Sequence, residues 1–116
     1  MASETPAAKT EYAHVVHSPG VVGGEARIAG RRIRVRDIAL ARDLGGLTPE
    51  EIAATVYPDL SLAQVYAALA YYEDHREEVN RSVEAEPRAV EEFLQRHPDL
   101  TRDVRLAKDS AASGGR

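Results

Sequence analysis

Two helix-start signals on either side of a proline constrain the fold of this chain more than any other feature. In residues 48–51 (Thr-Pro-Glu-Glu), a capping residue is followed by a proline at the first helical position and a glutamate three residues after the cap. Ser61 and Gln64 form a second capping box with the same spacing. Because Pro58 disfavours a helical conformation in the residue before it, the first helix is expected to end by Tyr57. The spacing predicts two helices joined by a tight break, as in a helix-turn-helix unit.

Apolar residues at helical spacing predict the helices around this break. A short helix is expected from Asp37 to the pair Gly45-Gly46, which would cap its C-terminus. A long alanine-rich helix is expected after Ser61, as the second and exposed helix of the unit. One stripe of this long helix is expected to be buried, and it consists of Leu62, Val65, Leu69, Tyr72 and Val79.

Period-two alternation before these helices predicts a β-hairpin with Ala29-Gly30 as its turn. The apolar face of the hairpin would cover the core, and the other face would present arginines to the outside. The apolar positions are Ala26, Ile28, Ile33 and Val35, and the polar positions are Glu25, Arg27, Arg32, Arg34 and Arg36.

Arginines are concentrated in this hairpin although the chain as a whole is acidic. Five of the thirteen arginines lie between Arg27 and Arg36, whereas the formal net charge is −4. Such a surface would suit a phosphate backbone, but a solvated strand face would have the same composition. We favour contact with DNA. The expected DNA-contacting residues are Arg27, Arg31, Arg32, Arg34 and Arg36, with Ser61 and Gln64 at the start of the second helix.

The second helix gives a weaker signal for DNA recognition than the hairpin. The side chain of Gln64 could pair with an adenine edge in the major groove. However, no lysine or arginine lies between Leu62 and Tyr72. A helix used only for packing or dimerisation would have the same sequence, so both interpretations stay open.

The C-terminal third of the chain is acidic and predicts a partner-binding helix. Pro87 opens an amphipathic segment, and Pro98 is expected to end its helix near His97. A lone helix of this length is marginal in water, so we expect the segment to be mobile in the free protein and ordered by a partner. Phe93 would be the anchor, although it could instead fold back on the core. The expected partner-binding residues are Val90, Phe93, Leu94, Leu100, Arg102 and Arg105.

Several residue types bear on the class of protein. The chain has no cysteine, which excludes thiolate catalysis and cysteine-ligated metals. Its four histidines are scattered, and no nucleophile–base or metal-ligating constellation is recognisable, so we expect no enzyme, no metal and no cofactor. No apolar run approaches the roughly 20 residues that span a bilayer, and no signal-peptide core is present. These features predict a soluble, cytoplasmic protein without a membrane partner.

Short motifs follow one another in a specific order between His17 and His75. They are Gly23-Gly24, Ile28, Gly30, Arg32-Ile33, Val35, Gly45, Glu51-Ile52, Tyr57–Leu60 and Ala67–Tyr72. This order resembles a family of small prokaryotic proteins long labelled domain of unknown function 433. The chain departs from the family pattern at Ala26, where the family often has proline, and at Arg31, where it often has threonine.

The resemblance implies a homeodomain-like or winged helix-turn-helix protein that dimerises. Members of this family look like the antitoxin halves of VapBC-type toxin–antitoxin pairs. The implied partners are therefore a PIN-type ribonuclease toxin and operator DNA. The leading hypothesis is a non-enzymatic antitoxin that neutralises the toxin and represses their shared operon. The alternative is a dimeric protein-interaction adaptor whose helix-turn-helix packs but does not bind DNA.

The expected fold class is mostly α, with a small N-terminal β-hairpin, a helix-turn-helix and a C-terminal amphipathic extension. Composition and pattern divide the chain into four parts. These are a flexible N-terminus (1–12), the hairpin and helix-turn-helix domain (13–80), the partner-binding segment (81–106) and a disordered tail (107–116).

Overall fold

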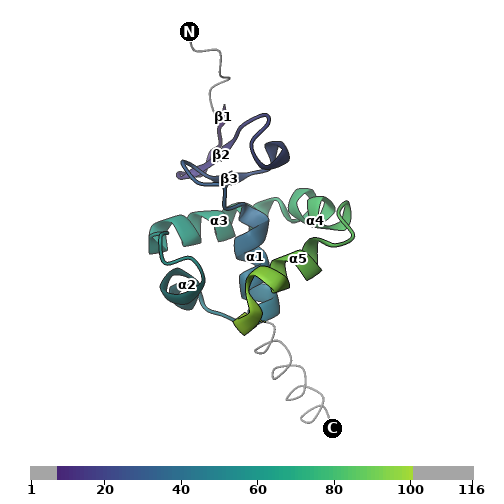
Figure 1. Ribbon diagram of the computed structural model, residues 1–116. Helices are drawn as coiled ribbons and strands as arrows, with labels where there is room; N and C mark the ends of the chain where they lie inside the picture. Colours follow the sequence, from purple (N-terminus) through teal and green to yellow (C-terminus); the bar gives the residue numbers. More distant parts are fainter. Residues whose placement is uncertain (1–7, 101–116) are drawn as a thin grey trace.

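Helices make up most of residues 8–100, the part of the chain that the computed structural model describes, and a small antiparallel sheet lies at one end (Figure 1). The helical elements are the 3-10 turn η1 (Val22–Gly24), α1 (Val35–Gly45), α2 (Pro49–Glu51), the π-helical turn η2 (Ile52–Val56), α3 (Leu62–Asp74), α4 (Arg76–Glu84) and α5 (Ala89–Arg96). The predicted class, mostly helical with a small N-terminal sheet, is confirmed. No helix within the described range is long and apolar enough to cross a membrane.

The sheet has three short strands in the order β1 (Ala8–Lys9), β2 (Val15–His17) and β3 (Arg27–Ile28). The central strand β2 pairs antiparallel with both neighbours, with Val15 opposite Ile28 and Ala8 opposite His17. Val15 and Ile28 are buried in the core. Strand β1 lies within residues 1–12, the part of the chain that composition predicted to be flexible.

The predicted hairpin is formed only in part. Gly30 takes a φ of +79°, and the backbone N–H of Ile28 donates to the carbonyl of Ile33 across the turn (2.9 Å). Beyond one isolated bridge between Arg27 and Arg34, no second strand follows, because the chain enters α1 at Val35. A carboxylate oxygen of Asp37 accepts the N–H of Arg34 (2.9 Å), which starts the helix where a strand was expected.

Both predicted capping boxes are present. The N–H of Glu51 donates to Thr48 Oγ1 (3.1 Å), and the N–H of Thr48 donates back to Glu51 Oε1 (2.8 Å). At the start of α3, the N–H of Ser61 donates to Gln64 Oε1 (2.7 Å) and the N–H of Gln64 donates to Ser61 Oγ (3.1 Å). The sequence signals therefore located the break around Pro58 correctly.

The long helix predicted after Ser61 is broken at His75. The His75 ring stacks on Tyr71 with ring centroids 4.1 Å apart, and its Nδ1 lies 3.0 Å from the Tyr71 carbonyl oxygen. This contact with the last turn of α3 competes with continuation of the helix. The chain resumes as α4, which places Val79 in the core beside α1.

The hydrophobic core surrounds α1, which α5 crosses in Figure 1. Val65, Leu69 and Tyr72 of α3 are buried as predicted, but Leu62, at the first position of that helix, is 39% exposed. The fully buried side chains with the largest volumes are Phe93, Ile28, Ile38, Ile52, Val15, Val35 and Val65.

Candidate functional site

Two of the five hairpin arginines are buried inside the protein. Arg27 is 9% exposed and Arg36 is 4% exposed. The guanidinium of Arg27 donates to Ser18 Oγ (2.6 Å) and to the carbonyl of Arg31 (2.9 Å). Arg36 lies in the first turn of α1 rather than on a strand, which points it into the fold. The prediction that these two arginines face the outside is therefore wrong.

Arg36 joins three parts of the molecule. Its Nη1 lies 2.8 Å from Glu86 Oε1 and 3.0 Å from the carbonyl oxygen of Ser82, at the end of α4. It also lies 3.5 Å from Glu25 Oε2, in the segment before β3. The hydrogen bond from Arg36 is the main reason that the pKa of Glu86 is lowered. The charge of Arg36 thus serves internal packing.

Arg34 is also engaged internally. Its side chain is 3.4 Å from both Glu25 and Asp37. Burial disfavours its charged form, but the two carboxylates outweigh that cost and raise the pKa of Arg34. Asp37 is buried and reaches Arg96 of α5 as well, with 3.6 Å between Oδ1 and Nη2.

These ion pairs form one connected set, which we term the six-charge network. It consists of Glu25, Arg34, Arg36, Asp37, Glu86 and Arg96. Three acids balance three bases, so the network is neutral. It ties the N-terminal region, the end of α4 and the end of α5 to the start of α1.

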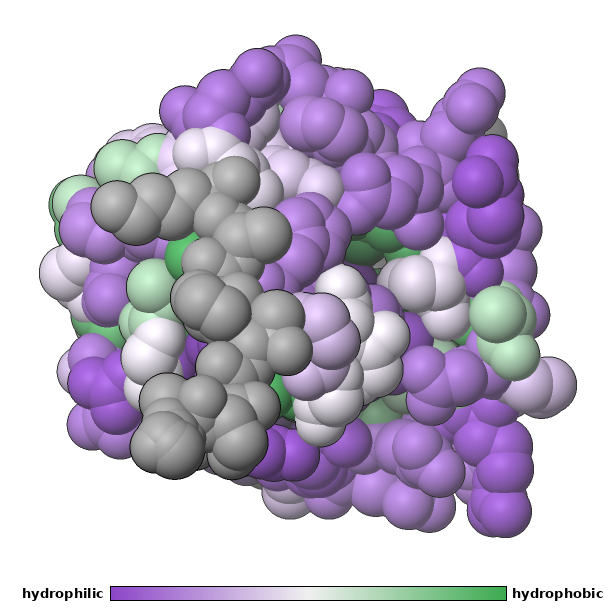
Figure 2. All heavy atoms as spheres, turned by 90° about the horizontal axis from the view of Figure 1, so that it is seen from above, coloured by the Kyte–Doolittle hydropathy of each residue, from purple (hydrophilic) through white to green (hydrophobic). Residues whose placement is uncertain are grey.

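Arg31 and Arg32 are the hairpin arginines that remain exposed. The Nη2 of Arg31 donates to the carbonyl of Asp59 (3.2 Å), in the turn before α3. The structure therefore brings Arg31 to the turn that leads into Ser61, the N-cap of α3. Hydrophilic side chains cover most of the face above the sheet (Figure 2).

The capping box occupies the polar atoms of Ser61 and Gln64 that were expected to meet DNA. Gln64 Oε1 and Ser61 Oγ each accept a backbone N–H, which leaves the Ser61 O–H and the amide NH₂ of Gln64 as donors not used by the cap. The outer face of α3 exposes Leu62 (39%) and Tyr66 (48%). The Tyr66 hydroxyl donates to Glu50 Oε2 (2.7 Å), which raises the pKa of Tyr66 and lowers that of Glu50.

The predicted partner-binding residues separate into three groups. Phe93 is fully buried because α5 packs its inner face against α1, and Leu100, which follows α5, is buried beside Gly45 at the end of α1. The prediction that they are open to a partner is wrong. Val90 is 36% exposed and lines a shallow groove together with Leu94. Arg102 and Arg105 lie outside the described residues.

Sequence reasoning missed an aromatic cluster between the sheet and the helices. Tyr12 contacts Tyr71 and His75 edge-on, and its hydroxyl donates to Asp74. His17 Nε2 lies 3.1 Å from the Tyr71 hydroxyl oxygen. These residues are far apart in the sequence and belong to no shared motif. The two consecutive valines Val15 and Val16 are the β-branched residues of their strand, and they do not alternate with polar residues.

The surroundings of Tyr71 keep its hydroxyl protonated. Its hydroxyl donates to Glu78 Oε2 (2.7 Å). Burial, and then the hydrogen bond and charge of Glu78, raise the pKa of Tyr71 well above its usual value. The phenol is therefore a hydrogen-bond donor rather than a base. Within residues 8–100, no group of three or more His, Asp or Glu side chains is arranged to hold a metal ion.

A family model and a solved structure both relate this chain to the same protein family. Residues 15–72 match the model described as "Protein of unknown function (DUF433)". A crystal structure of a DUF433 member from Anabaena variabilis ATCC 29413 is 36% identical, with a TM-score of 0.55 over 60% of this chain and 67% of that one. No curated protein matches significantly. The matched region runs from β2 into the last turn of α3 and therefore includes both capping boxes. The chain belongs to the DUF433 family of proteins of unknown function.

Proposed function

We propose that this chain is the antitoxin of a type II toxin–antitoxin pair. In this proposal it is a non-enzymatic, cytoplasmic, dimeric helix-turn-helix protein that binds operator DNA and covers a PIN-type ribonuclease. The observation that carries the proposal is the order of α2 and η2, a tight turn and the capped helix α3, with Arg31 hydrogen-bonded to that turn. The resemblance of the family to VapB-type antitoxins supports the same assignment.

The proposed DNA contact is centred on the N-terminal end of α3. A helix N-terminus favours a phosphate because its N–H groups and dipole point toward the anion. Arg31 and Arg32 would supply the cationic contacts beside it, and the free amide donor of Gln64 could reach a base edge. The buried Arg27 and Arg36 and the ion-paired Arg34 would hold this region in shape.

The proposed toxin contact lies on the outer face of α5. Val90 and Leu94 form an apolar groove between Pro87 and Pro98, with Glu91 and Gln95 beside them. A partly exposed apolar groove with a polar rim is the composition expected of a protein interface. Phe93 would contribute indirectly, because its burial fixes α5 on the core.

Salt-dependent DNA binding tests the proposal. With DNA from the region upstream of its own gene, the Arg31→Ala/Arg32→Ala variant should bind more weakly than wild type. Losing two phosphate contacts should reduce the log–log salt slope by about 2. The matched control is Arg81→Ala/Arg88→Ala, which removes the same charge from side chains that are 75% and 73% exposed elsewhere. Equal slopes for the two double variants would contradict the proposed contact.

The second candidate is a dimeric protein-interaction adaptor that does not bind DNA. The outer face of α3 favours the adaptor, because it exposes the apolar and aromatic side chains of Leu62 and Tyr66. No lysine or arginine lies between Leu62 and Tyr72 to contact DNA. An adaptor of this kind would show no salt-dependent DNA binding. Tyr66→Glu would dissociate its dimer, whereas Val90→Glu would leave the dimer intact.

A further inference from the structure

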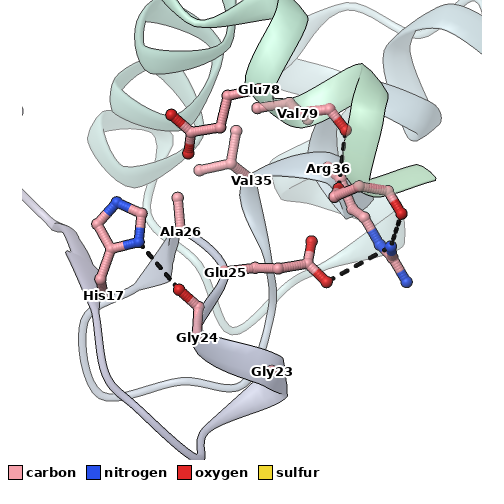
Figure 3. A pocket seen from close by; sticks show the side chains of 10 residues that line it. His17, Gly23, Gly24, Glu25, Ala26, Val35, Arg36, Glu78 and Val79 are labelled. Atoms are coloured by element: carbon pink, nitrogen blue, oxygen red, sulfur yellow. Dashed lines mark hydrogen bonds and ion pairs between the residues drawn. The ribbon is translucent and has the colours of Figure 1, made fainter. Parts of the chain in front are cut away.

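A pocket of about 210 Å³ lies between the loop before β3, the start of α1, and α4 (Figure 3). Ala26, Val35 and Val79 form its apolar wall, and all three are buried. Gly23 and Gly24 lie at its edge with φ of +72° and +79°, a left-handed turn without side chains. The pocket is separate from the α3 and α5 surfaces described above.

Two carboxylates from different parts of the chain line this pocket. Figure 3 shows Glu78, from α4, on one side of the apolar wall and Glu25, from the loop, on another. Glu78 accepts the Tyr71 hydroxyl, but no arginine of the described residues forms an ion pair with it. The charge of Glu78 is therefore not neutralised by an arginine, in contrast to that of Glu25, which is paired with Arg34 and Arg36.

The basic side chains at the pocket are already engaged with the protein. Arg36 contacts Glu86, Glu25 and the Ser82 carbonyl and is almost completely buried. His17 lies with Nδ1 3.0 Å from the Gly24 carbonyl oxygen and with Nε2 at the Tyr71 hydroxyl. An anionic ligand would meet both carboxylates before it reached a free cation, so the charge arrangement disfavours it.

We propose that this pocket receives a basic side chain, arginine or lysine, from a partner protein. The methylene stem would lie along Ala26, Val35 and Val79, as long basic side chains do on apolar surfaces. The cationic head would lie beside Glu78 and toward Glu25. The inference deepens the proposed function and rests on it only in taking the toxin as the partner that supplies the side chain.

The first experiment needs no variant. Nα-acetyl-arginine methylamide is titrated into the ¹⁵N-labelled full chain and followed by NMR, with the neutral isostere Nα-acetyl-citrulline methylamide as the control. The arginine probe should shift the amide signals of Gly23, Gly24 and Val79 with a millimolar dissociation constant, and the citrulline probe should not. Equal shifts from the two probes, or none from either, would overturn the proposal.

A charge-neutral variant identifies the carboxylate. Glu78→Gln can still accept the Tyr71 hydroxyl but carries no charge, so it should weaken binding of the arginine probe by about fivefold, the size of one exposed ion pair. Glu77→Gln, on the same helix with a side chain that is almost fully exposed, should not change it. Equal affinity of Glu78→Gln and wild type would exclude Glu78 as the binding carboxylate and overturn the proposal. The titration uses neither DNA nor toxin, so its outcome is independent of the antitoxin assignment.

Discussion

At the scale of single residues, Asp37 is a buried carboxylate that connects two helices. It caps α1 through the N–H of Arg34, pairs with the Arg34 guanidinium and reaches Arg96 on α5. A buried carboxylate with several partners is costly to remove, because its partners are then left with uncompensated charge. One side chain thus links the start of α1 to the end of α5.

Asp37→Ala should therefore destabilise the protein strongly. We expect a loss of about 3 kcal/mol in the free energy of unfolding, measured by urea denaturation with an unchanged m-value. Asp43→Ala removes a carboxylate from an exposed ion pair of the same helix and should cost less than about 1 kcal/mol. If the two variants unfolded at the same urea concentration, the role assigned to Asp37 would be incorrect.

His97 gives the stability of the protein a dependence on pH. Burial beside Phe93 and Tyr57, and then the charge of Arg96, lower the pKa of His97 below its ordinary value of 6.5. The unfolded chain therefore binds a proton at a higher pH than the folded chain does. Stability should be full above pH 6.5 and should fall as the pH decreases toward the lowered pKa of the folded state.

The measurement is the urea midpoint of wild type and His97→Gln between pH 7.5 and about 5, above the range in which the carboxylates titrate. The decrease in the midpoint should be smaller in the variant, because glutamine does not titrate. Parallel curves for the two proteins would assign the pH dependence to other groups.

At the scale of the elements, the helix boundaries were largely predictable and the connections between elements were not. Capping boxes and Pro58 are local signals, and they located α2, η2 and α3 correctly. The break at His75 depends on its stacking against Tyr71, a contact that no periodicity reports. The prediction of a second hairpin strand was wrong because Asp37 caps a helix that begins at Val35. This is two residues before the period-two alternation gives way to helical spacing.

The candidate site was also predicted only in part, because contacts between residues distant in the sequence decide which arginines are exposed. Arg31 and Arg32 are exposed as predicted, but the same prediction was made for the other three hairpin arginines. The burial of Arg27 and Arg36 depends on partners as distant as Glu86, which lies fifty positions after Arg36. Alternation along one segment cannot distinguish an arginine in water from one paired inside the fold.

The position of α5 makes a direct prediction about its two faces. Phe93→Ala should destabilise the protein by about 3–5 kcal/mol, because the buried ring leaves a cavity in the core. Val90→Ala, on the outer face of the same helix, should change stability by less than about 0.5 kcal/mol. Equal and small effects, measured by thermal or urea unfolding, would show that α5 does not pack on α1 in solution.

At the scale of the whole molecule, the proposal assigns three separate surfaces to three kinds of contact. The N-terminal end of α3 with Arg31 and Arg32 is assigned to DNA, and the outer face of α5 to the toxin. The pocket beside Glu78 is assigned to a basic side chain. The six-charge network holds Glu25, the end of α4 and the end of α5 to the start of α1. Helix α3 packs against α1 through the hydrophobic core.

The central claim predicts that a PIN-type ribonuclease is encoded beside this chain, and inhibition of RNA cleavage by that ribonuclease tests the claim most directly. The purified full chain, added to that ribonuclease in increasing amounts, should abolish cleavage at a fixed stoichiometry. Val90→Glu should inhibit much less than wild type, whereas Arg31→Ala/Arg32→Ala should inhibit fully because it alters only the DNA contact. Undiminished cleavage in the presence of excess wild-type protein, or the lack of such a ribonuclease gene, would contradict the antitoxin assignment.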